Sequence, residues 1–223
     1  MNLVEEIEKL KSTLPAHVKL VAISKTKPVE LIREAYNSGH KIFGENKVQE
    51  LVGKYEMLPK DTEWHMVGHL QTNKVKYITP FISMIHGVDN FKLLKVINKE
   101  AKKNNRIISC LLQIKIAKED SKFGLTQNEV EQILESDEFD ELSNVKILGL
   151  MGMASFSDDE NIIRDEFREL VSIFKIIQQK YFATVPEFKE LSMGMSTDYK
   201  IAIEEGSTMI RIGSLIFGER VYP

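Results

Sequence analysis

A lysine and an arginine are the side chains of this sequence best suited to covalent and electrostatic chemistry. Lys25 follows the apolar run Val21 to Ser24 in VAISKTKP, and Arg211 lies in the apolar segment TMIRIGS. A lysine amine that is crowded by a second cation and by apolar walls has a lowered pKa, which makes it a better nucleophile toward an aldehyde. The alternative is that Lys25 only marks the solvent-exposed end of a strand, which is the role we expect for Lys27.

Serine and glycine residues in two further segments supply donors for an anion. The segment SMGMS contains Ser192 and Ser196, and RIGS contains Gly213 and Ser214. A phosphate group is bound by hydroxyl groups and by backbone N–H groups that approach closely, which glycine permits. A single glycine–serine pair usually marks only a turn, so the prediction of a phosphate site depends on the two segments lying near one another.

A repeated pattern of short apolar strands and amphipathic helices has to position these residues. We expect strands at 18–24, 41–45, 64–68, 82–87, 107–116, 145–152, 190–194 and 208–213. Helical periodicity and capping signals predict helices in the first 14 residues and at 28–39, 46–58, 90–105, 125–136, 160–181 and 197–206. Strands that alternate with helices in this way form a parallel sheet.

Eight such units favour a single (β/α)8 barrel of the TIM type that covers residues 1–223 as one domain, with an open doubly wound sheet as the alternative. The chain is slightly shorter than the ~250 residues typical of that barrel, so its loops must be short. In such a barrel the active site lies at the carboxyl ends of the strands, and the eighth strand pairs with the first. Lys25 and Arg211 would then be neighbours, beside the loops after strands seven and eight that often bind phosphate.

Histidine and acidic residues at other predicted strand ends have less specific interpretations. His65 and His69 share one face of a strand, but no acidic residue stands between them, so we expect hydrogen-bonded histidines of a cleft rather than a metal site. His86 and Asp89 are either a base with its orienting carboxylate or an ordinary loop pair.

Two further groups lie near predicted strand ends. Lys122, in the loop after strand five, either reaches the site or is a solvated loop lysine. The same loop also carries Lys118 and Asp120. Methionines near strands six and seven are more typical of core packing than of a functional group: Met151, Met153, Met193 and Met195.

Composition narrows the class of protein. The formal net charge is −3, from 30 basic and 33 acidic residues without a basic stripe, so we do not expect a nucleic-acid partner. The single cysteine, Cys110, cannot form an internal disulfide, which suits a reducing compartment. No apolar run approaches the ~20 residues of a membrane span, and the amphipathic N-terminus is unlike a signal peptide. We therefore expect a soluble cytoplasmic protein.

Six segments together resemble one known family. ISKTKP, FGENKVQE, WHMVGHLQTNK, LGLMGMAS, LSMGMSTDY and STMIRIGSLIFGER are similar to motifs of the pyridoxal phosphate homeostasis proteins, and they occur in the family order. These proteins look like the N-terminal barrel of alanine racemase standing alone. The resemblance spans about residues 4–221. It implies pyridoxal 5'-phosphate (PLP) as the cofactor and a role in vitamin B6 homeostasis, with PLP-dependent apo-enzymes as candidate recipients.

The same resemblance implies roles for individual residues. Lys25 would hold PLP as a Schiff base, Asn46 would lie near the cofactor ring, and Arg211 would face the pyridine nitrogen. The residues that match phosphate-binding positions of the family are Ser192, Ser196, Gly213 and Ser214. Ser214 stands where the family often has threonine, which preserves the hydroxyl group.

The resemblance also favours a carrier over an enzyme. An arginine opposite the pyridine nitrogen disfavours a proton there, so the ring stabilises a carbanion less well. The second domain of the racemases, which by resemblance supplies a catalytic tyrosine and the main dimer surface, has no counterpart in this sequence. We therefore expect a monomeric PLP carrier without strong catalysis. A single-domain amino-acid racemase or related PLP enzyme is the alternative, and a metal-dependent hydrolase is a third hypothesis.

Overall fold

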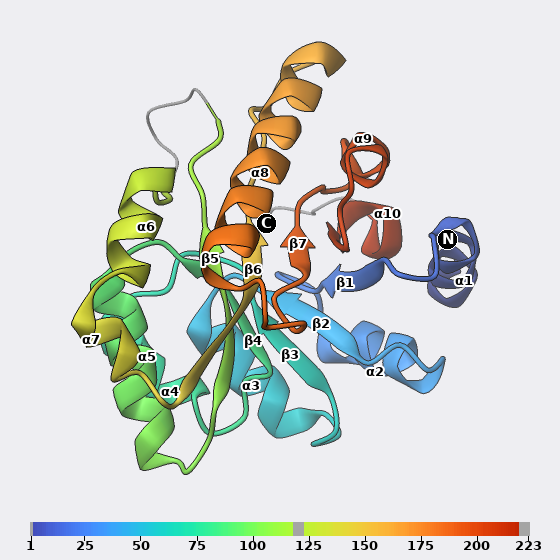
Figure 1. Ribbon diagram of the computed structural model, residues 1–223. Coiled ribbons are helices and arrows are strands. Elements are labelled where there is room, and N and C mark those ends of the chain that lie inside the picture. The colour runs from blue at the N-terminus through green and yellow to red at the C-terminus, as the bar shows by residue number, and fades with distance from the viewer. Residues whose placement is uncertain (1, 118–122, 219–223) are drawn as a thin grey trace.

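Eight parallel strands form a closed barrel in the order β1 to β8, and β8 pairs with β1 (Figure 1). The computed structural model describes residues 2–117 and 123–218. The strands are β1 (Lys19–Ile23), β2 (Ile42–Glu45), β3 (Glu63–Met66), β4 (Met84–Val88), β5 (Ile108–Gln113), β6 (Val145–Met151), β7 (Glu190–Ser192) and β8 (Met209–Ile212). The prediction of a closed barrel with eight strands is confirmed.

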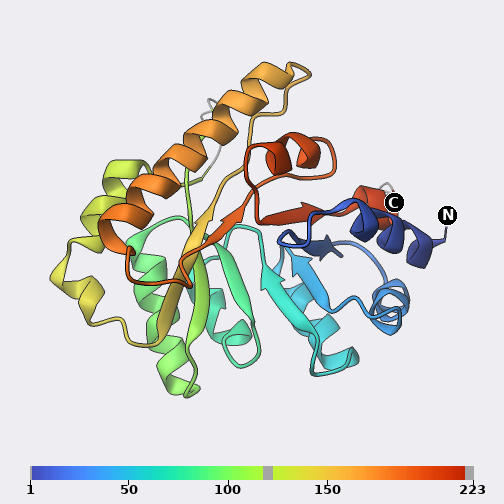
Figure 2. The same cartoon turned by 45° about the vertical axis from the view of Figure 1, so that its right-hand side comes forward.

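Helices cover the outside of the barrel, and the longest of them, α8, runs obliquely across it (Figure 2). The helices are α1 (Leu3–Thr13), α2 (Val29–Asn37), α3 (Val48–Met57), η1 (Thr72–Lys74), α4 (Val75–Ile78), α5 (Phe91–Lys103), α6 (Gln127–Leu134), α7 (Asp137–Asp140), α8 (Glu160–Tyr181), α9 (Tyr199–Glu204) and α10 (Ser214–Phe217). All seven helices expected from the sequence are present. The segments η1, α4, α7 and α10 escaped prediction because three or four residues are too few to show a helical period.

Local signals explain where two of these helices begin and which face they bury. At the start of α6, the Thr126 hydroxyl accepts a hydrogen bond from the Glu129 N–H, and the Glu129 carboxylate accepts one from the Thr126 N–H, which completes the predicted capping box. In α8, Ile163, Phe167 and Leu170 recur at helical spacing and are buried. Their burial against the barrel stabilises the helix.

Apolar side chains fill two separate layers. The larger layer lies between the strands and the surrounding helices and includes Trp64 and Phe167. A smaller cluster consists of Val21, Ile23, Val67, Met84, Leu111, Met151 and Met209. Its members lie on several strands, so this cluster fills the interior of the barrel. Arg211 pairs in register with Val21 across β8 and β1. Since side chains of paired residues lie on the same face of a sheet, Arg211 also points into the barrel.

Strands β6 and β7 approach closely at Gly149, which pairs with Glu190. Gly149 has a φ of +154°, and a Cβ atom at this position would lie 1.7 Å from the carbonyl oxygen of Glu190. Only glycine can therefore occupy this point of the barrel without displacing a neighbouring strand.

No helix within residues 2–117 and 123–218 combines the length and the apolar character that crossing a membrane requires.

Candidate active site

A cavity of about 320 Å³ opens where β1, β2 and β8 end. This volume lies at the lower end of the range of about 300–1,000 Å³ that is usual for small-molecule sites. Six of the residues singled out in the sequence line it: Lys25, Asn46, Ser196, Arg211, Gly213 and Ser214. The closure of the barrel explains this arrangement, because it brings the turn after β1 next to the segments that follow β7 and β8.

The lining of the cavity is cationic. Lys25, Lys27 and Arg211 all contribute to it, and none of the described lining residues is acidic. Three residues with hydroxyl groups, Ser196, Thr197 and Ser214, also belong to the lining. A cavity with this set of cationic and hydrogen-bonding residues favours an anionic ligand, because hydrogen bonds from charged donors to anions are stronger than those between neutral groups.

Arg211 is anchored at the bottom of the cavity by backbone and side-chain acceptors. Its Nη1 donates hydrogen bonds to the carbonyl oxygen of Ser192 at 2.8 Å and to the Ser192 hydroxyl at 2.7 Å. Its Nη2 donates to the carbonyl oxygen of Gly152 at 3.0 Å. Burial lowers the pKa of Arg211 to about 10, so the guanidinium remains charged at neutral pH. The cation therefore has a fixed position and a fixed charge.

Ser192 and Ser196, although they belong to one short motif, lie in different environments. Ser192 is completely buried, and it does not line the cavity. Gly194, with a φ of +94°, redirects the chain after β7, and Ser196 reaches the cavity. The structure therefore separates Ser192 from the other residues that were grouped around a phosphate.

Two histidines continue the polar contacts of Ser192 into the barrel. The Ser192 hydroxyl lies 3.0 Å from His86 Nδ1, and His86 Nε2 lies 3.0 Å from His65 Nδ1. Since a guanidinium can only donate, the Ser192 oxygen accepts from Arg211, and its hydroxyl hydrogen is left to donate to His86. His86 then donates to His65.

Both of these histidines are neutral at pH 7. Burial lowers the pKa of His65 to about 3, and burial followed by the nearby His65 and Arg211 lowers the pKa of His86 well below its usual value. The hydrogen bonds confirm the expectation of a hydrogen-bonded histidine at position 65.

The pair His86 and Asp89, considered in the sequence analysis, does not form. Asp89 instead contacts His69, with 2.8 Å between Oδ2 and Nδ1, and the His69 ring stacks on Phe123 with ring centroids 4.2 Å apart. Both ring nitrogens of His86 are used by Ser192 and His65, and Asp89 lies beyond the end of β4. Within residues 2–117 and 123–218, no group of three or more histidine, cysteine, aspartate or glutamate side chains is placed to hold a metal ion.

The loops after β7 and β8 meet at Gly213. The Gly213 N–H donates to the Ser196 hydroxyl at 3.3 Å, which joins the two segments that the sequence analysis paired. A Cβ atom on residue 213 would lie 3.3 Å from the carbonyl oxygen of Ile23, so glycine lets this backbone pack closely against β1. Helix α10 begins at the next residue, Ser214. Hydroxyl and backbone donors are thus gathered on one side of the cavity.

Lys27 is not the solvent-facing lysine that the sequence suggested. It is half-buried, lines the cavity, and donates from Nζ to the carbonyl oxygens of Phe217 at 2.8 Å and Gly218 at 3.0 Å. These carbonyl groups stand at the end of α10, where a cation interacts favourably with the helix. Lys27 therefore connects the turn after β1 to the end of the described chain.

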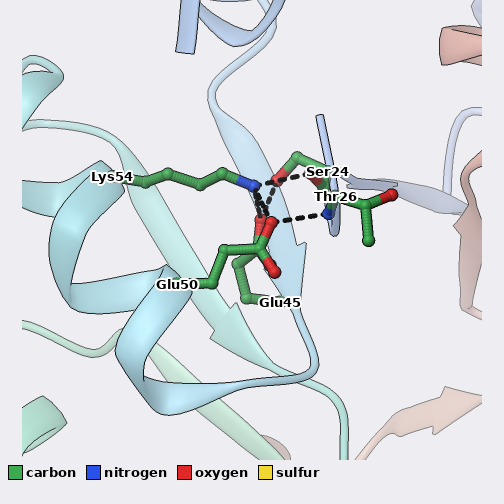
Figure 3. A network of polar contacts seen from close by, with 5 residues as sticks. All are labelled: Ser24, Thr26, Glu45, Glu50 and Lys54. Carbon is green, nitrogen blue, oxygen red and sulfur yellow. Dashed lines mark hydrogen bonds and ion pairs between the residues drawn. The ribbon is translucent and has the colours of Figure 1, made fainter. Parts of the chain in front are cut away.

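A largely buried network of polar side chains lies against one side of the turn that carries Lys25 (Figure 3). Lys54 Nζ donates to the carbonyl oxygen of Ser24, to Glu45 Oε1 and to Glu50 Oε1, each at 2.6 Å. Burial raises the pKa of Glu45, and Lys54 and Ser24 oppose this effect. The network could not be recognised from the sequence, because a glutamate and a lysine four residues apart on a helix are usually an exposed pair.

The remaining residues from the sequence analysis fall into two groups. Lys118, Asp120 and Lys122 lie outside the described residues. Among the four methionines, Met151 and Met193 are buried, in agreement with core packing. Met153 and Met195 instead line the cavity, where no sequence signal distinguished them from the other two.

Comparison with known sequences connects the chain to one family. Residues 2–221 match the family model described as alanine racemase, N-terminal domain. A pyridoxal phosphate homeostasis protein from Aquifex aeolicus is 44% identical over 205 residues, which cover 92% of this chain and 88% of the relative. The protein of the same name from Mus musculus is 39% identical over 221 residues, which cover 94% of this chain and 80% of the relative.

Solved structures are similar over nearly the whole chain. PipY of Synechococcus elongatus with PLP bound has a TM-score of 0.87 and 34% identity, and the match covers 97% of this chain and 100% of that chain. Alanine racemase from E. faecalis shares the fold, with a TM-score of 0.74 and 14% identity, and the match covers 98% of this chain and 58% of that chain. Both structures thus match this barrel along its length, although the racemase chain extends well beyond it.

Proposed function

The chain belongs to the pyridoxal phosphate homeostasis protein family, and from this we propose that it holds PLP in the cavity through a Schiff base to Lys25. The observation that carries the proposal is that Lys25, Arg211 and the group Ser196, Gly213 and Ser214 line one cavity. PLP offers a matching group for each of them, namely an aldehyde, a pyridine nitrogen and a phosphate.

The chemistry of the lining fits this cofactor. The lysine amine suits an aldehyde, and the hydroxyl and backbone donors around Gly213 suit a phosphate. The cationic lining without a described acidic residue suits the negative charge of the ligand. Among the residues first assigned to the phosphate, we exclude Ser192 from this role, because its buried hydroxyl lies between Arg211 and His86.

Each residue then has a distinct task. With PLP bound, Lys25 would hold its aldehyde carbon, Ser196, Gly213 and Ser214 would hold its phosphate, and Asn46 would lie near the ring. Arg211 stays charged and opposes a proton on the pyridine nitrogen. Bound PLP supplies a conjugated ring that withdraws electrons most strongly when this nitrogen is protonated. The protein therefore acts as a carrier that sequesters a reactive aldehyde and supplies it to PLP-dependent apo-enzymes, without strong catalysis of its own.

We extend the proposal to the whole chain. Residues 1–223 act as one domain, as a monomer in the cytoplasm, without a nucleic-acid partner. The continuous barrel and the match to relatives over nearly the entire chain support a single domain. The net charge of −3 is unlike that of a nucleic-acid-binding protein, and the free cysteine Cys110 suits a reducing compartment.

Covalent labelling tests the assignment of the cofactor and the lysine together. Purified protein incubated with PLP should absorb visible light, and borohydride reduction followed by peptide mapping should place the pyridoxyl group on Lys25. The Lys25→Ala variant should lose the label, whereas Lys47→Ala, which removes an exposed lysine nearby, should retain it. Retention of covalent cofactor in Lys25→Ala protein would overturn the assignment.

Hydrogen exchange separates the carrier from the racemase. We expect negligible exchange at Cα when the PLP-loaded protein is incubated with L-alanine or L-serine in deuterated water. Exchange at the rate of a PLP enzyme would favour the single-domain racemase instead.

A further inference from the structure

The turn that carries Lys25 has an unfavourable backbone conformation. Its ends are joined by a hydrogen bond from the Lys27 N–H to the carbonyl oxygen of Ser24, at 3.0 Å. Thr26 has a φ of +65°, a region that glycine enters readily and a β-branched residue rarely does. Such a conformation persists only when the surrounding structure enforces it. The contacts of the two residues on either side of Lys25 show what enforces it.

Both neighbours of Lys25 are fixed by side chains from β2 and α3 (Figure 3). On one side, the Ser24 hydroxyl donates to Glu45 Oε1, and the Ser24 carbonyl oxygen accepts from Lys54 Nζ, each at 2.6 Å. On the other side, the Thr26 N–H donates to Glu50 Oε1 at 2.5 Å. The turn is therefore held from both ends, and Lys25 lies between the two fixed residues.

Lys54 joins the contacts on the two sides of Lys25, and we call Glu45, Glu50 and Lys54 together the clamp. Its three ammonium hydrogens are used on three acceptors: the Ser24 carbonyl oxygen, Glu45 and Glu50. A shorter or uncharged side chain at position 54 would leave the two carboxylates next to each other without a cation between them. The geometry of the turn therefore depends on a lysine whose own backbone is 30 residues from Ser24.

The burial of this network is hard to explain by stability alone. The side chains of Lys54 and Glu45 are 5% and 0% exposed, and Glu45 Oε2 makes no hydrogen bond within the described part of the chain. Replacing a buried ion pair with apolar residues is often neutral or stabilising, so the pair is weak evidence of a contribution to stability. A role in positioning a neighbouring group accounts for it better.

We propose that Glu45, Glu50 and Lys54 are positioning residues for Lys25, which hold the turn 24–27 in its strained conformation so that the amine is presented to the cavity. This inference rests on the proposed role of Lys25 as the residue that binds an aldehyde. The hydrogen bonds of these three residues go to the turn and to one another, and none of those described reaches Ser196, Gly213 or Ser214. We therefore expect them to act on the amine and not on the anion-binding part of the cavity.

The variant Glu50→Ala tests the clamp at its least buried member, whose side chain is 24% exposed. It removes the acceptor of the Thr26 N–H, and we expect the equilibrium constant for imine formation to fall about tenfold, both with PLP and with pyridoxal, which has no phosphate. Glu50→Gln keeps an oxygen acceptor and should retain most of the wild-type value. The inhibition constant of inorganic phosphate in competition with PLP should be the same in all three proteins, because the residues assigned to the phosphate are unchanged.

A second substitution at the strained residue distinguishes positioning from a general loss of structure. Thr26→Gly adopts a positive φ without strain, so the double variant Glu50→Ala with Thr26→Gly should regain imine formation to within about threefold of wild type. The double variant Lys54→Met with Glu45→Gln removes the buried charges together and should show the same loss as Glu50→Ala. Lys180→Met, which removes an exposed lysine between Glu131 and Glu135, is the matched control and should show none.

The outcomes separate this inference from the proposed function. If wild-type protein forms no reducible imine at Lys25, the proposed function fails. If it forms one, and Glu50→Ala and the Lys54 double variant bind both aldehydes as tightly as wild type, only the clamp is wrong. A loss with PLP but not with pyridoxal would also overturn it, because that pattern would locate the effect at the phosphate. Failure of Thr26→Gly to restore imine formation would contradict the role of backbone strain.

Discussion

The guanidinium of Arg211 and the hydroxyl of Ser192 lie 2.7 Å apart, and the same guanidinium also binds the Ser192 carbonyl oxygen at 2.8 Å. These two contacts join the last two strands of the barrel at the bottom of the cavity. Because Ser192 also reaches His86, the position of the arginine is coupled to two histidines in the barrel interior. The guanidinium of Arg211 is thus fixed by buried residues of the barrel interior.

Removal of this hydroxyl should cost stability. In Ser192→Ala, one donor of Arg211 and the ring nitrogen of His86 lose a buried partner, and we expect the free energy of unfolding to fall by about 1–3 kcal/mol. Urea denaturation followed by circular dichroism measures the change. Ser12→Ala, which removes an exposed hydroxyl from α1, should change it by less than about 0.5 kcal/mol. Equal stability of the two variants would show that the Arg211 contact is not important for the fold.

The phosphate assignment predicts a difference between two ligands. Ser196→Ala should weaken binding of PLP about tenfold or more, because a hydrogen bond to a charged group contributes about 1.5–3 kcal/mol. Binding of pyridoxal, which lacks the phosphate, should stay within about twofold of wild type. Absorption titrations with both ligands measure this, and Ser214→Ala provides an independent second test. The same loss for both ligands would place Ser196 elsewhere in the site.

Burial of neutral histidines predicts that acid weakens the fold. The folded-state pKa of His65 is lowered to about 3 and that of His40 to about 4, whereas both residues titrate near 6.5 when unfolded. Below pH 6.5 the unfolded chain binds protons that the folded chain does not, so the stability present above that pH is lost as the pH falls toward the folded-state values. Each such histidine contributes a slope of up to about 1.4 kcal/mol per pH unit.

Urea unfolding at pH 7, 6 and 5 checks the sign and the size of this effect. In His65→Gln, the free energy of unfolding should depend less on pH between pH 6 and 5, by about 1.4 kcal/mol per pH unit, because about one proton fewer is taken up on unfolding. The comparison variant is His17→Gln, which replaces an exposed histidine and leaves the buried contact between His65 and His86 intact. A stability that rises as the pH is lowered would contradict the burial of neutral histidines.

Two glycines should respond in opposite ways to the same substitution. Gly149→Ala would put a Cβ atom 1.7 Å from the Glu190 carbonyl oxygen, so we expect a loss of more than about 3 kcal/mol or a failure to fold. Gly53 lies within α3, where an added Cβ atom would have no neighbouring atom within 4 Å, and Gly53→Ala should be neutral or stabilise by up to about 1 kcal/mol. Thermal unfolding of both variants measures the contrast. A well-folded Gly149→Ala protein would contradict the close approach of β6 and β7.

The barrel could be predicted because its signals are local and repeated. Apolar runs define the eight strands, and signals such as Thr126 with Glu129 define helix starts. The neighbourhood of Lys25 and Arg211 follows from one further step, the pairing of the first strand with the last. That Lys25 and Arg211 lie at one cavity can therefore be predicted from the sequence, although the hydrogen bonds around them cannot.

The remaining features depend on side-chain direction, which the sequence does not encode locally. Ser192 and Ser196 belong to one motif, and only the turn at Gly194 sends them to different environments. Lys54 stands four residues after Glu50, like many exposed ion pairs, and its burial follows from the position of α3 against the turn after β1. The environments of such residues become known only when the packing of the helices and strands is known.

Lys27 contacts the carbonyl oxygen of Phe217 across a separation of 190 residues. A nascent chain therefore carries Lys25 long before the ribosome has made the residues on the opposite side of the cavity. Until β8 has joined β1, the cavity of a growing chain lacks the residues that β8 and the segment after it contribute. The cavity is thus completed only by the last strand, and translation products that stop before β8 should lack it.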